Sequence, residues 1–178
     1  MSSFQEIADS YKKLCNYCET FWNRVAGKFP AEFACAPGCS TCCELQSVNL
    51  LEAYVIAGHC GPGIPSAPRL PDSGCPFLTN NLCRIYPARP IICRTHGLLL
   101  KSREFRDRTA PSCPFNFTTV DHAAIDDGYA LDVDMVTMDL AKLNAAFCLL
   151  LGDIKKVSER ITLRDLASGK IGRPWFGV

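Results

Sequence analysis

Residues 35–43 read Cys35-Ala36-Pro37-Gly38-Cys39-Ser40-Thr41-Cys42-Cys43. Four thiols lie within nine residues, and the Pro-Gly pair between them bends the chain, so the sulfur atoms can converge on one point. Thiolates bind soft and borderline metal ions strongly, and sets of four cysteines are typical of zinc sites and iron–sulfur clusters. This stretch therefore predicts a metal centre that organises the chain around it.

The rest of the chain is also rich in cysteine. There are 12 cysteines in 178 residues, and nine of them lie between Cys35 and Cys113. The first residues carry charges of both signs and no long apolar run, so no secretion signal is indicated and we expect reduced thiols in a cytoplasmic protein. A disulfide-stapled loop is the alternative interpretation of residues 35–43, but a disulfide between adjacent cysteines is strained.

Composition limits the remaining function classes. A length of 178 residues predicts one domain, and 48% apolar residues suffice for a core. The net charge of +1 gives no whole-chain signal for nucleic acid or an anionic membrane, and no stretch approaches the ~20 apolar residues of a membrane span. We therefore expect no nucleic-acid and no membrane partner. A redox or protein partner is expected, but its identity does not follow from the sequence.

The two ends of the chain predict helices. Apolar residues recur at steps of three and four from Phe4 to Val25, and again from Val136 to Leu150. The two matching stripes predict that these helices pack together. Shorter helices are expected at 50–59, where Asn49 caps the start, and at 162–168, where Thr162 and Asp165 have capping-box spacing. Cys18 in the first stripe and Cys148 in the last helix are expected in the core. Cys15 lies three residues before Cys18 and could share a site with it on one helix face, but a structural role is the better interpretation.

The middle of the chain predicts loops and short strands. Four prolines make 61–74 an extended surface loop. Residues 76–78 and 82–85 flank Thr79-Asn80-Asn81 and predict a small hairpin with Cys75 and Cys83 near its open end. Leu98 to Leu100 is a further candidate strand. The expected fold is mainly α: one domain, 1–178, with an N-terminal helix in 1–30, a cysteine-cluster core in 35–115 and C-terminal helices in 130–170.

Two features favour an iron–sulfur cluster over a single structural zinc ion. Structural zinc sites use paired cysteine knuckles, whereas the later cysteines stand apart from one another. The adjacent thiols of Cys42 and Cys43 start in different directions and suit two metal atoms. The C-x3-C-x2-C spacing is also that of radical S-adenosylmethionine enzymes, but their barrel needs more than the ~200 residues of a minimal barrel and a strand–helix alternation that is missing here.

Read together, the middle of the chain resembles a known family. The order is C-x3-C-x2-C-C, Leu51-Glu52-Ala53, Cys75-Pro76-Phe77-Leu78, Cys83-Arg84-Ile85-Tyr86-Pro87, Arg89-Pro90 and Cys93-Arg94. Over residues 35–115 this is similar to the bacterial cysteine-cluster proteins classed as zinc- or iron-chelating (YkgJ type). A related cysteine-rich domain occurs in flagellin lysine N-methylases, which use S-adenosylmethionine and are much longer than this chain.

The resemblance implies a set of metal ligands, to which we add one further cysteine of the same segment: Cys35, Cys39, Cys42, Cys43, Cys75, Cys83, Cys93 and Cys113. Three arginines recur among them, Arg84, Arg89 and Arg94, and are candidates for binding the cofactor because a thiolate-ligated centre is anionic. They could equally bind a substrate anion or be ordinary surface residues. His96 could ligate or hydrogen-bond a thiolate, although a plain loop histidine is the better interpretation.

Three functions follow as hypotheses. The first is an iron–sulfur protein with a redox or electron-transfer role, for which a [4Fe–4S] cluster is favoured. If it is an enzyme, it is an iron–sulfur oxidoreductase. The alternative is a zinc protein that presents a binding surface without catalysis. The third is a small iron–sulfur enzyme that uses S-adenosylmethionine. No catalytic residue is identified, and no P-loop, dinucleotide fingerprint or serine-triad motif supports another enzyme class.

Overall fold

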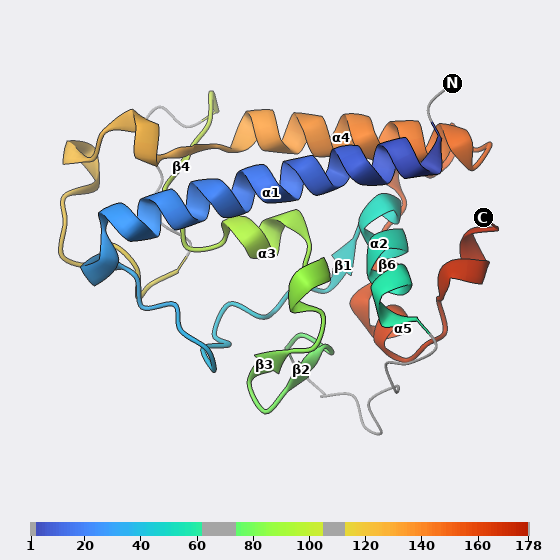
Figure 1. Ribbon diagram of the computed structural model, residues 1–178, viewed down its shortest axis with the longest axis horizontal. Coiled ribbons are helices and arrows are strands. Elements are labelled where there is room, and N and C mark those ends of the chain that lie inside the picture. Colours follow the sequence, from blue (N-terminus) through green and yellow to red (C-terminus); the bar gives the residue numbers. More distant parts are fainter. Residues whose placement is uncertain (1–2, 62–73, 105–112, 178) are drawn as a thin grey trace. The chain divides into compact units, whose positions relative to one another are not determined.

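The computed structural model describes residues 3–61, 74–104 and 113–177 (Figure 1). The predicted loop at 61–74 falls almost wholly outside these residues. The α-helices in the described residues are α1 (Phe4–Lys28), α2 (Leu50–Cys60), α3 (Ile91–Thr95), α4 (Val133–Leu150) and α5 (Leu163–Ala167). The strands are β1 (Ser47–Val48), β2 (Leu78–Thr79), β3 (Leu82–Cys83), β4 (Leu100–Lys101), β5 (Leu131–Asp132) and β6 (Ile161–Thr162). The prediction of a mainly helical fold is confirmed.

The short strands form three two-stranded sheets in the described part of the chain. β1 pairs with β6 and β2 with β3, both antiparallel, whereas β4 and β5 are parallel. Six short 3-10 helices connect the elements: η1 (Pro30–Glu32), η2 (Tyr86–Ala88), η3 (His122–Ala124), η4 (Asp127–Tyr129), η5 (Ile154–Ser158) and η6 (Arg173–Phe176).

The chain divides into two compact units, each assembled from separate segments. The first unit comprises Met1–Ser10, Pro37–Pro90 and Lys142–Val178, and the second comprises Tyr11–Ala36 and Ile91–Ala141. Each unit is described by itself below. The division matters for function because the predicted metal ligands are shared out between the two units.

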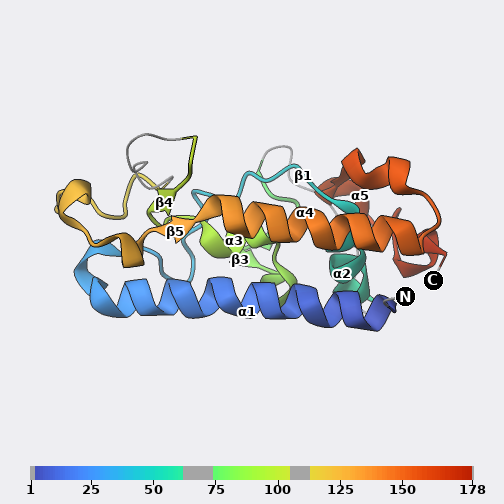
Figure 2. The ribbon, with the colours of Figure 1, turned by 90° about the horizontal axis from the view of Figure 1, so that it is seen from above.

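In the first unit, the start of α1 packs against the end of α4 (Figures 1 and 2). The rings of Phe4 and Phe147 meet edge to face, with centroids 5.6 Å apart. Tyr54 of α2 lies 5.2 Å from Phe147 and 5.4 Å from Phe176, also measured between ring centroids. The prediction that helices from both ends of the chain pack together is confirmed, and the aromatic side chains of the two stripes explain it.

The caps expected in this unit are also present. The Asn49 side chain accepts a hydrogen bond from the backbone N–H of Glu52 at 2.9 Å and caps α2. Thr162 accepts from the N–H of Asp165 at 3.0 Å and caps α5. These caps satisfy backbone donors that have no partner inside the helix, which is why the sequence signal located both helix starts.

The core of the second unit is built on the apolar stripe of α1. Tyr11, Leu14, Cys18, Phe21 and Val25 are all buried, as the spacing predicts. The predicted strand at 98–100 is shifted: β4 begins at Leu100, whereas Leu98 and Leu99 are fully buried beside it.

The acidic segment 121–141 holds six Asp and no Lys or Arg, and its carboxylates act mainly as local caps. Asp121 accepts a hydrogen bond from the N–H of Ala123 at 3.0 Å, and Asp126 accepts one from the N–H of Gly128 at 2.7 Å. Asp132 accepts one from the N–H of Met135 at 3.0 Å. Asp132 is therefore the cap of α4. This use of the carboxylates explains the local excess of negative charge without a ligand.

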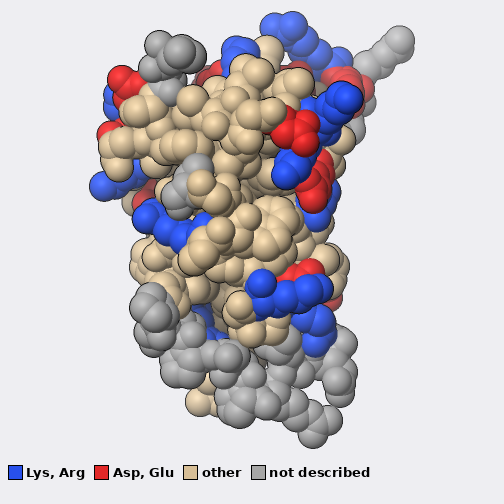
Figure 3. Space-filling view, turned by 90° about the vertical axis from the view of Figure 1, so that its right-hand side faces the viewer, with Lys and Arg blue, Asp and Glu red and all other residues tan. Residues whose placement is uncertain are grey.

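Charges of both signs are mixed on the face of the molecule shown in Figure 3, which carries broad areas without Lys, Arg, Asp or Glu. Within residues 3–61, 74–104 and 113–177, none of the helices combines the length and the apolar character needed to cross a bilayer.

Candidate metal centre

The cysteine-rich loop and the β2–β3 hairpin are joined in the first unit. The backbone N–H of Cys75 donates to the carbonyl of Cys43 at 2.7 Å. At the other end of the hairpin, the Ser40 hydroxyl donates to the Asn81 side-chain oxygen at 3.3 Å. Two hydrogen bonds therefore tie the C-x3-C-x2-C-C stretch to a segment some 35 residues further along the chain.

The hairpin forms because its turn sequence suits it. Asn80 and Asn81 have φ of 50° and 60°, the left-handed conformation that both central residues of a type I′ turn require and that Asn tolerates. Leu78 stands opposite Cys83 in the register. The predicted hairpin is confirmed, and Cys75 and Cys83 lie near its open end as expected.

Each of these two cysteines comes immediately before a turn that directs a backbone donor at its sulfur atom. The N–H of Phe77 donates to the sulfur of Cys75, and the N–H of Ile85 donates to the sulfur of Cys83. The two turns share a pattern in which the donor lies two residues after the cysteine. Hydrogen bonds of this kind stabilise a thiolate and tune a metal bound to it.

The thiols of the first unit interact electrostatically as a set, which we call the five-thiol group: Cys39, Cys42, Cys43, Cys75 and Cys83. Burial raises the pKa of Cys43, and the charges of Cys75 and Cys83 raise it further. Burial likewise raises the pKa of Cys42 to about 11, and repulsion from Cys43 and Cys39 adds to this rise. The Cys42 thiol also donates a hydrogen bond to Cys43.

These raised pKa values bear on whether the residues fit a metal. At neutral pH Cys42, Cys43, Cys75 and Cys83 are held largely as neutral thiols, since burial and mutual repulsion penalise several thiolates close together. A cation among the sulfur atoms removes that penalty and displaces the protons. Five soft donors with backbone N–H groups directed at two of them are a donor set that suits zinc or iron.

The five thiols are neighbours, but they do not form a closed ligand shell. Among the described residues, no group of three or more Cys, His, Asp or Glu side chains is arranged to hold a metal ion. All twelve cysteines of the chain lie in described segments and are free thiols, so the disulfide-stapled alternative for residues 35–43 is not observed. Uncharged thiols do not attract one another. A bound cation is what draws sulfur atoms together into a closed ligand shell.

The other predicted ligands lie in the second unit. Cys35 is exposed, Cys93 is exposed on α3, and Cys113 is buried. A buried asparagine, Asn116, is within hydrogen-bonding distance of the Cys35 sulfur. The eight predicted ligands are therefore divided, five in the first unit and three in the second.

The three candidate arginines have different surroundings. Arg89 stacks on Tyr86, with its guanidinium carbon 3.8 Å from the ring centroid, and its charge lowers the pKa of Cys83 against the larger effect of burial. Arg84 acts in the same way on Cys60. Arg94 is buried and forms an ion pair with Glu19 of α1. The charge of Arg89 thus acts on a member of the five-thiol group.

The remaining cysteines behave as the helical stripes predict. Cys18 and Cys148 are fully buried, and Cys15 is 5% exposed. Burial and the neighbouring Cys15 thiol raise the pKa of Cys18 to about 11, which makes it an unreactive thiol. Burial lowers the pKa of His96, so its imidazole is neutral at pH 7.

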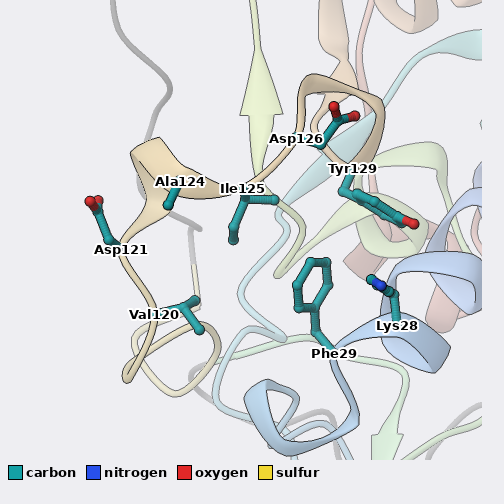
Figure 4. A pocket seen from close by; sticks show the side chains of 8 residues that line it. All are labelled: Lys28, Phe29, Val120, Asp121, Ala124, Ile125, Asp126 and Tyr129. Carbon is teal, nitrogen blue, oxygen red and sulfur yellow. The ribbon is translucent and has the colours of Figure 1, made fainter.

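A pocket of about 410 Å³ lies elsewhere in the second unit (Figure 4). Its lining is mostly apolar, and the rings of Phe29 and Tyr129 meet edge to face in it, 5.3 Å apart. Asp121 and Asp126 also line it, but both carboxylates cap 3-10 helices, as described above. No cysteine lines this pocket, so it is separate from the predicted chemistry.

Sequence reasoning missed the groups that position the thiols. The backbone donors of Phe77 and Ile85 leave no side-chain signature, although the recurring turn after each cysteine is a usable signal in retrospect. The Ser40–Asn81 contact and the role of Asn116 join segments that are distant in the sequence, and neither follows any periodic pattern.

Comparison with known proteins agrees with the resemblance. Residues 34–114 match the model of the family CxxCxxCC, described as "Putative zinc- or iron-chelating domain". The match spans the five-thiol group together with Cys35, Cys93 and Cys113. No curated protein and no solved structure matches the chain.

Proposed function

Taking as premise that residues 34–114 are a cysteine-rich domain of the zinc- or iron-chelating class, we propose that the protein is an iron–sulfur protein with a redox or electron-transfer role. Its cluster, for which we favour [4Fe–4S], would be held by the five-thiol group. For the second unit, taken by itself, we propose Cys35, Cys93 and Cys113 as metal ligands.

The observation that carries the proposal is the grouping of five thiols within one unit, where the N–H of Cys75 donates to the Cys43 carbonyl and the Ser40 hydroxyl donates to Asn81. Cys43 senses the charges of Cys39, Cys75 and Cys83, so segments more than 30 residues apart in the sequence bring sulfur atoms together. A single tetrahedral ion uses four ligands, whereas this group offers five. Adjacent cysteines, one of which donates a hydrogen bond to the other, suit neighbouring metal atoms of a cluster better than one ion.

The surrounding groups fit an anionic centre. The N–H groups of Phe77 and Ile85 are directed at the sulfurs of Cys75 and Cys83, and the positive charge of Arg89 acts on Cys83. Hydrogen bonds to sulfur and nearby positive charge stabilise a thiolate-ligated cluster and raise its reduction potential. When bound, such a cluster supplies one-electron transfer. The chain's own contribution is to hold the sulfurs and set their electrostatic environment.

The test is elemental analysis of the full chain purified without oxygen. Iron and acid-labile sulfide in comparable amounts, a broad visible absorption and bleaching on reduction are the expected results. Zinc in place of iron, in a colourless protein, would overturn the iron–sulfur proposal and favour the zinc-binding structural alternative.

A variant pair then checks the ligands. Changing Cys39→Ser and Cys42→Ser together is expected to remove most of the bound metal. Cys148→Ala, in the core of α4, is the matched control and should leave metal content unchanged. Equal metal in the double variant and the wild type would contradict the assignment of the five-thiol group.

The third hypothesis, an enzyme that uses S-adenosylmethionine, has its own readout. If one iron of the cluster lacks a cysteine ligand, adding S-adenosylmethionine should change the electron paramagnetic resonance spectrum of the reduced protein. An unchanged spectrum would leave electron transfer as the proposed role.

A further inference from the structure

Asn116 in the second unit is the most enclosed polar side chain near a predicted ligand. It is 2% exposed and lies three residues after Cys113. Neither the motif reading nor the family match, which ends at residue 114, includes it. A buried amide persists only where its hydrogen bonds are satisfied, so its partners indicate what it does.

Two backbone groups fix the orientation of the Asn116 amide. Its oxygen accepts from the N–H of Ala34 at 3.0 Å, and its nitrogen donates to the carbonyl of Gly97 at 3.0 Å. Because a backbone N–H can only donate and a carbonyl can only accept, reversing the amide would break both bonds. The nitrogen of the side chain is therefore fixed on the Gly97 side.

The same nitrogen lies 3.5 Å from the sulfur of Cys35. The Cys35 thiol is also 3.8 Å from the Asn116 oxygen and can donate to it. A thiol can use either contact, but a metal-bound thiolate has no proton to donate and can only accept from the amide N–H. Deprotonation of Cys35 therefore converts this contact into a charge-assisted N–H···S hydrogen bond.

Gly97 lets the side-chain amide of Asn116 come close to the backbone of residue 97. It has φ of +85°, and a Cβ built on it would lie 2.6 Å from the Asn116 nitrogen and 3.5 Å from the Cys113 Cβ. A side chain at this position would clash with the amide. The close packing brings Asn116, the loop after α3 and Cys113 together around one glycine.

A second set of contacts holds the segment in place. The N–H of Phe117, which has the left-handed φ of 54°, donates to the Glu32 carbonyl at 2.8 Å. The buried Glu32 carboxylate accepts from the N–H and hydroxyl of Thr119. Residues 116–119 are thus fastened to the segment that leads into Cys35, independently of any metal.

We propose that Asn116 is a positioning residue for metal ligation in the second unit: it donates its side-chain N–H to the Cys35 thiolate and holds Cys35 in register with the Cys113 segment. The inference rests on the proposed function, since it assigns Cys35 as a ligand. It extends that function by naming a residue outside the cysteine motif. This residue sets the orientation of the Cys35 ligand and the affinity for the metal.

The first unit provides a matched control. Asn144 of α4 is 3% exposed, and its oxygen accepts from the N–H of Leu51 at 3.1 Å while its nitrogen donates to the Val157 carbonyl at 3.0 Å. Both asparagines therefore bridge two backbone segments in the same way. Asn116 also contacts a thiol, whereas the two side-chain hydrogen bonds of Asn144 are both to backbone groups.

The experiment compares Asn116→Asp with Asn144→Asp in the full chain, stripped of metal and titrated with Co²⁺ under nitrogen. Each variant keeps an accepting oxygen and loses the donor, so both should lower stability to a similar extent. Asn116→Asp should also weaken Co²⁺ binding by roughly 10- to 100-fold, as loss of a group that orients a ligand does, and change the thiolate-to-cobalt charge-transfer band. Asn144→Asp should change neither.

The outcomes separate the two proposals. If the wild type binds no Co²⁺ through thiolates, the proposed function itself fails. If the wild type binds and Asn116→Asp binds equally well with the same spectrum, the role of Asn116 is refuted and the metal centre stands. In a Cys35→Ala background, Asn116→Asp should have no further effect on affinity, because its partner is gone.

A measurement on the wild type covers the case in which Asn116→Asp does not fold. The side-chain amide resonances of Asn116 should shift when Cd²⁺ is added to the wild type and stay in place in Cys35→Ala. Resonances that do not respond to Cd²⁺ in the wild type would overturn the proposal.

Discussion

The cysteines of the helices and those of the first unit's loops are held in opposite ways. Cys18 in α1 and Cys148 in α4 are fully buried within apolar stripes. Cys75 and Cys83 come immediately before turns and are partly exposed, with backbone N–H groups directed at their sulfurs. In the helices sulfur serves as a small apolar packing atom. In the loops it is also a hydrogen-bond acceptor: the backbone N–H groups favour the thiolate, although burial has the larger effect and raises the pKa of both thiols.

The backbone explains this difference. In the interior of an α-helix each N–H is already bonded to a carbonyl four residues earlier. The backbone N–H of Cys18 therefore affects its own sulfur only weakly, and burial together with Cys15 outweighs it and raises the pKa of this thiol. In the turns after Cys75 and Cys83, the N–H two residues on is available for the sulfur. Cysteine is therefore an unreactive packing residue in the helices and a candidate metal ligand in the loops. Four predictions test this contrast.

The largest expected effect comes from removing two loop thiols. Cys43→Ser with Cys75→Ser should reduce metal affinity by more than about 100-fold, since losing ligands costs more than losing the groups that orient them. Cys15→Ala, in the α1 stripe, should lower stability by roughly 1–2 kcal/mol through a small cavity and keep the metal. Metal analysis and urea unfolding measure both. A Cys15→Ala protein without metal would remove the contrast between helix and loop.

The second prediction concerns metal removal. A chelator should speed amide hydrogen exchange in residues 37–48 and 75–89, where ligation contributes to folding. The same treatment should leave exchange in α1 and α4 nearly unchanged, since apolar packing holds these helices. Exchange measured by mass spectrometry before and after chelation distinguishes the two regions. Equal acceleration throughout the chain would mean that metal stabilises the whole fold.

The third prediction uses two glycines. Gly97→Ala should destabilise the protein by about 1–3 kcal/mol, because the position combines a positive φ with a close approach to Asn116. Gly27→Ala lies in α1 with nothing within 4 Å of the added Cβ, and should be neutral or stabilise by up to ~1 kcal/mol. Thermal unfolding of both variants is the measurement. Loss of stability in Gly27→Ala alone would reverse the expected order.

The smallest effect is a pH dependence at α5. Hydrogen bonds from Thr162 and Lys170 lower the pKa of Asp165 below its ordinary value. The carboxylate therefore stabilises the fold above its unfolded-state pKa, and this stability is lost as pH falls through the lower, folded-state pKa. Because the group is exposed, the effect should be only a few tenths of a kcal/mol. Asp165→Asn should flatten the acid limb of urea unfolding without changing metal content at pH 7.

Local signals in the sequence predicted much of the fold. The stripes of α1 and α4, the caps Asn49, Thr162 and Asp132, and the Asn80-Asn81 turn all express interactions within a few residues. Such interactions are repeated or paired at fixed spacing, so they can be found in a single chain. The shifted strand at Leu100 shows the limit, since pairing with Leu131 decides it.

The sequence predicted the kind of ligand atom at the candidate site, but not which cysteines lie together. The cysteine count and spacing pointed to thiolate chemistry, and the ligand set remains a proposal. Five of the eight candidate ligands lie in the first unit and three in the second, and the cysteine spacing does not predict this division. Nor does it predict the contact between Cys35 and Asn116, which are 81 residues apart.

The amino-acid order alone determined which segments become helices and where soft donors are concentrated, because both depend on near neighbours in the chain. Only the folded chain decided which sulfurs share a unit, which backbone N–H groups face them, and which asparagine bridges to Cys35. Those relations join remote segments through burial and single hydrogen bonds, and a contact of that kind leaves no spacing rule in the sequence from which to infer it.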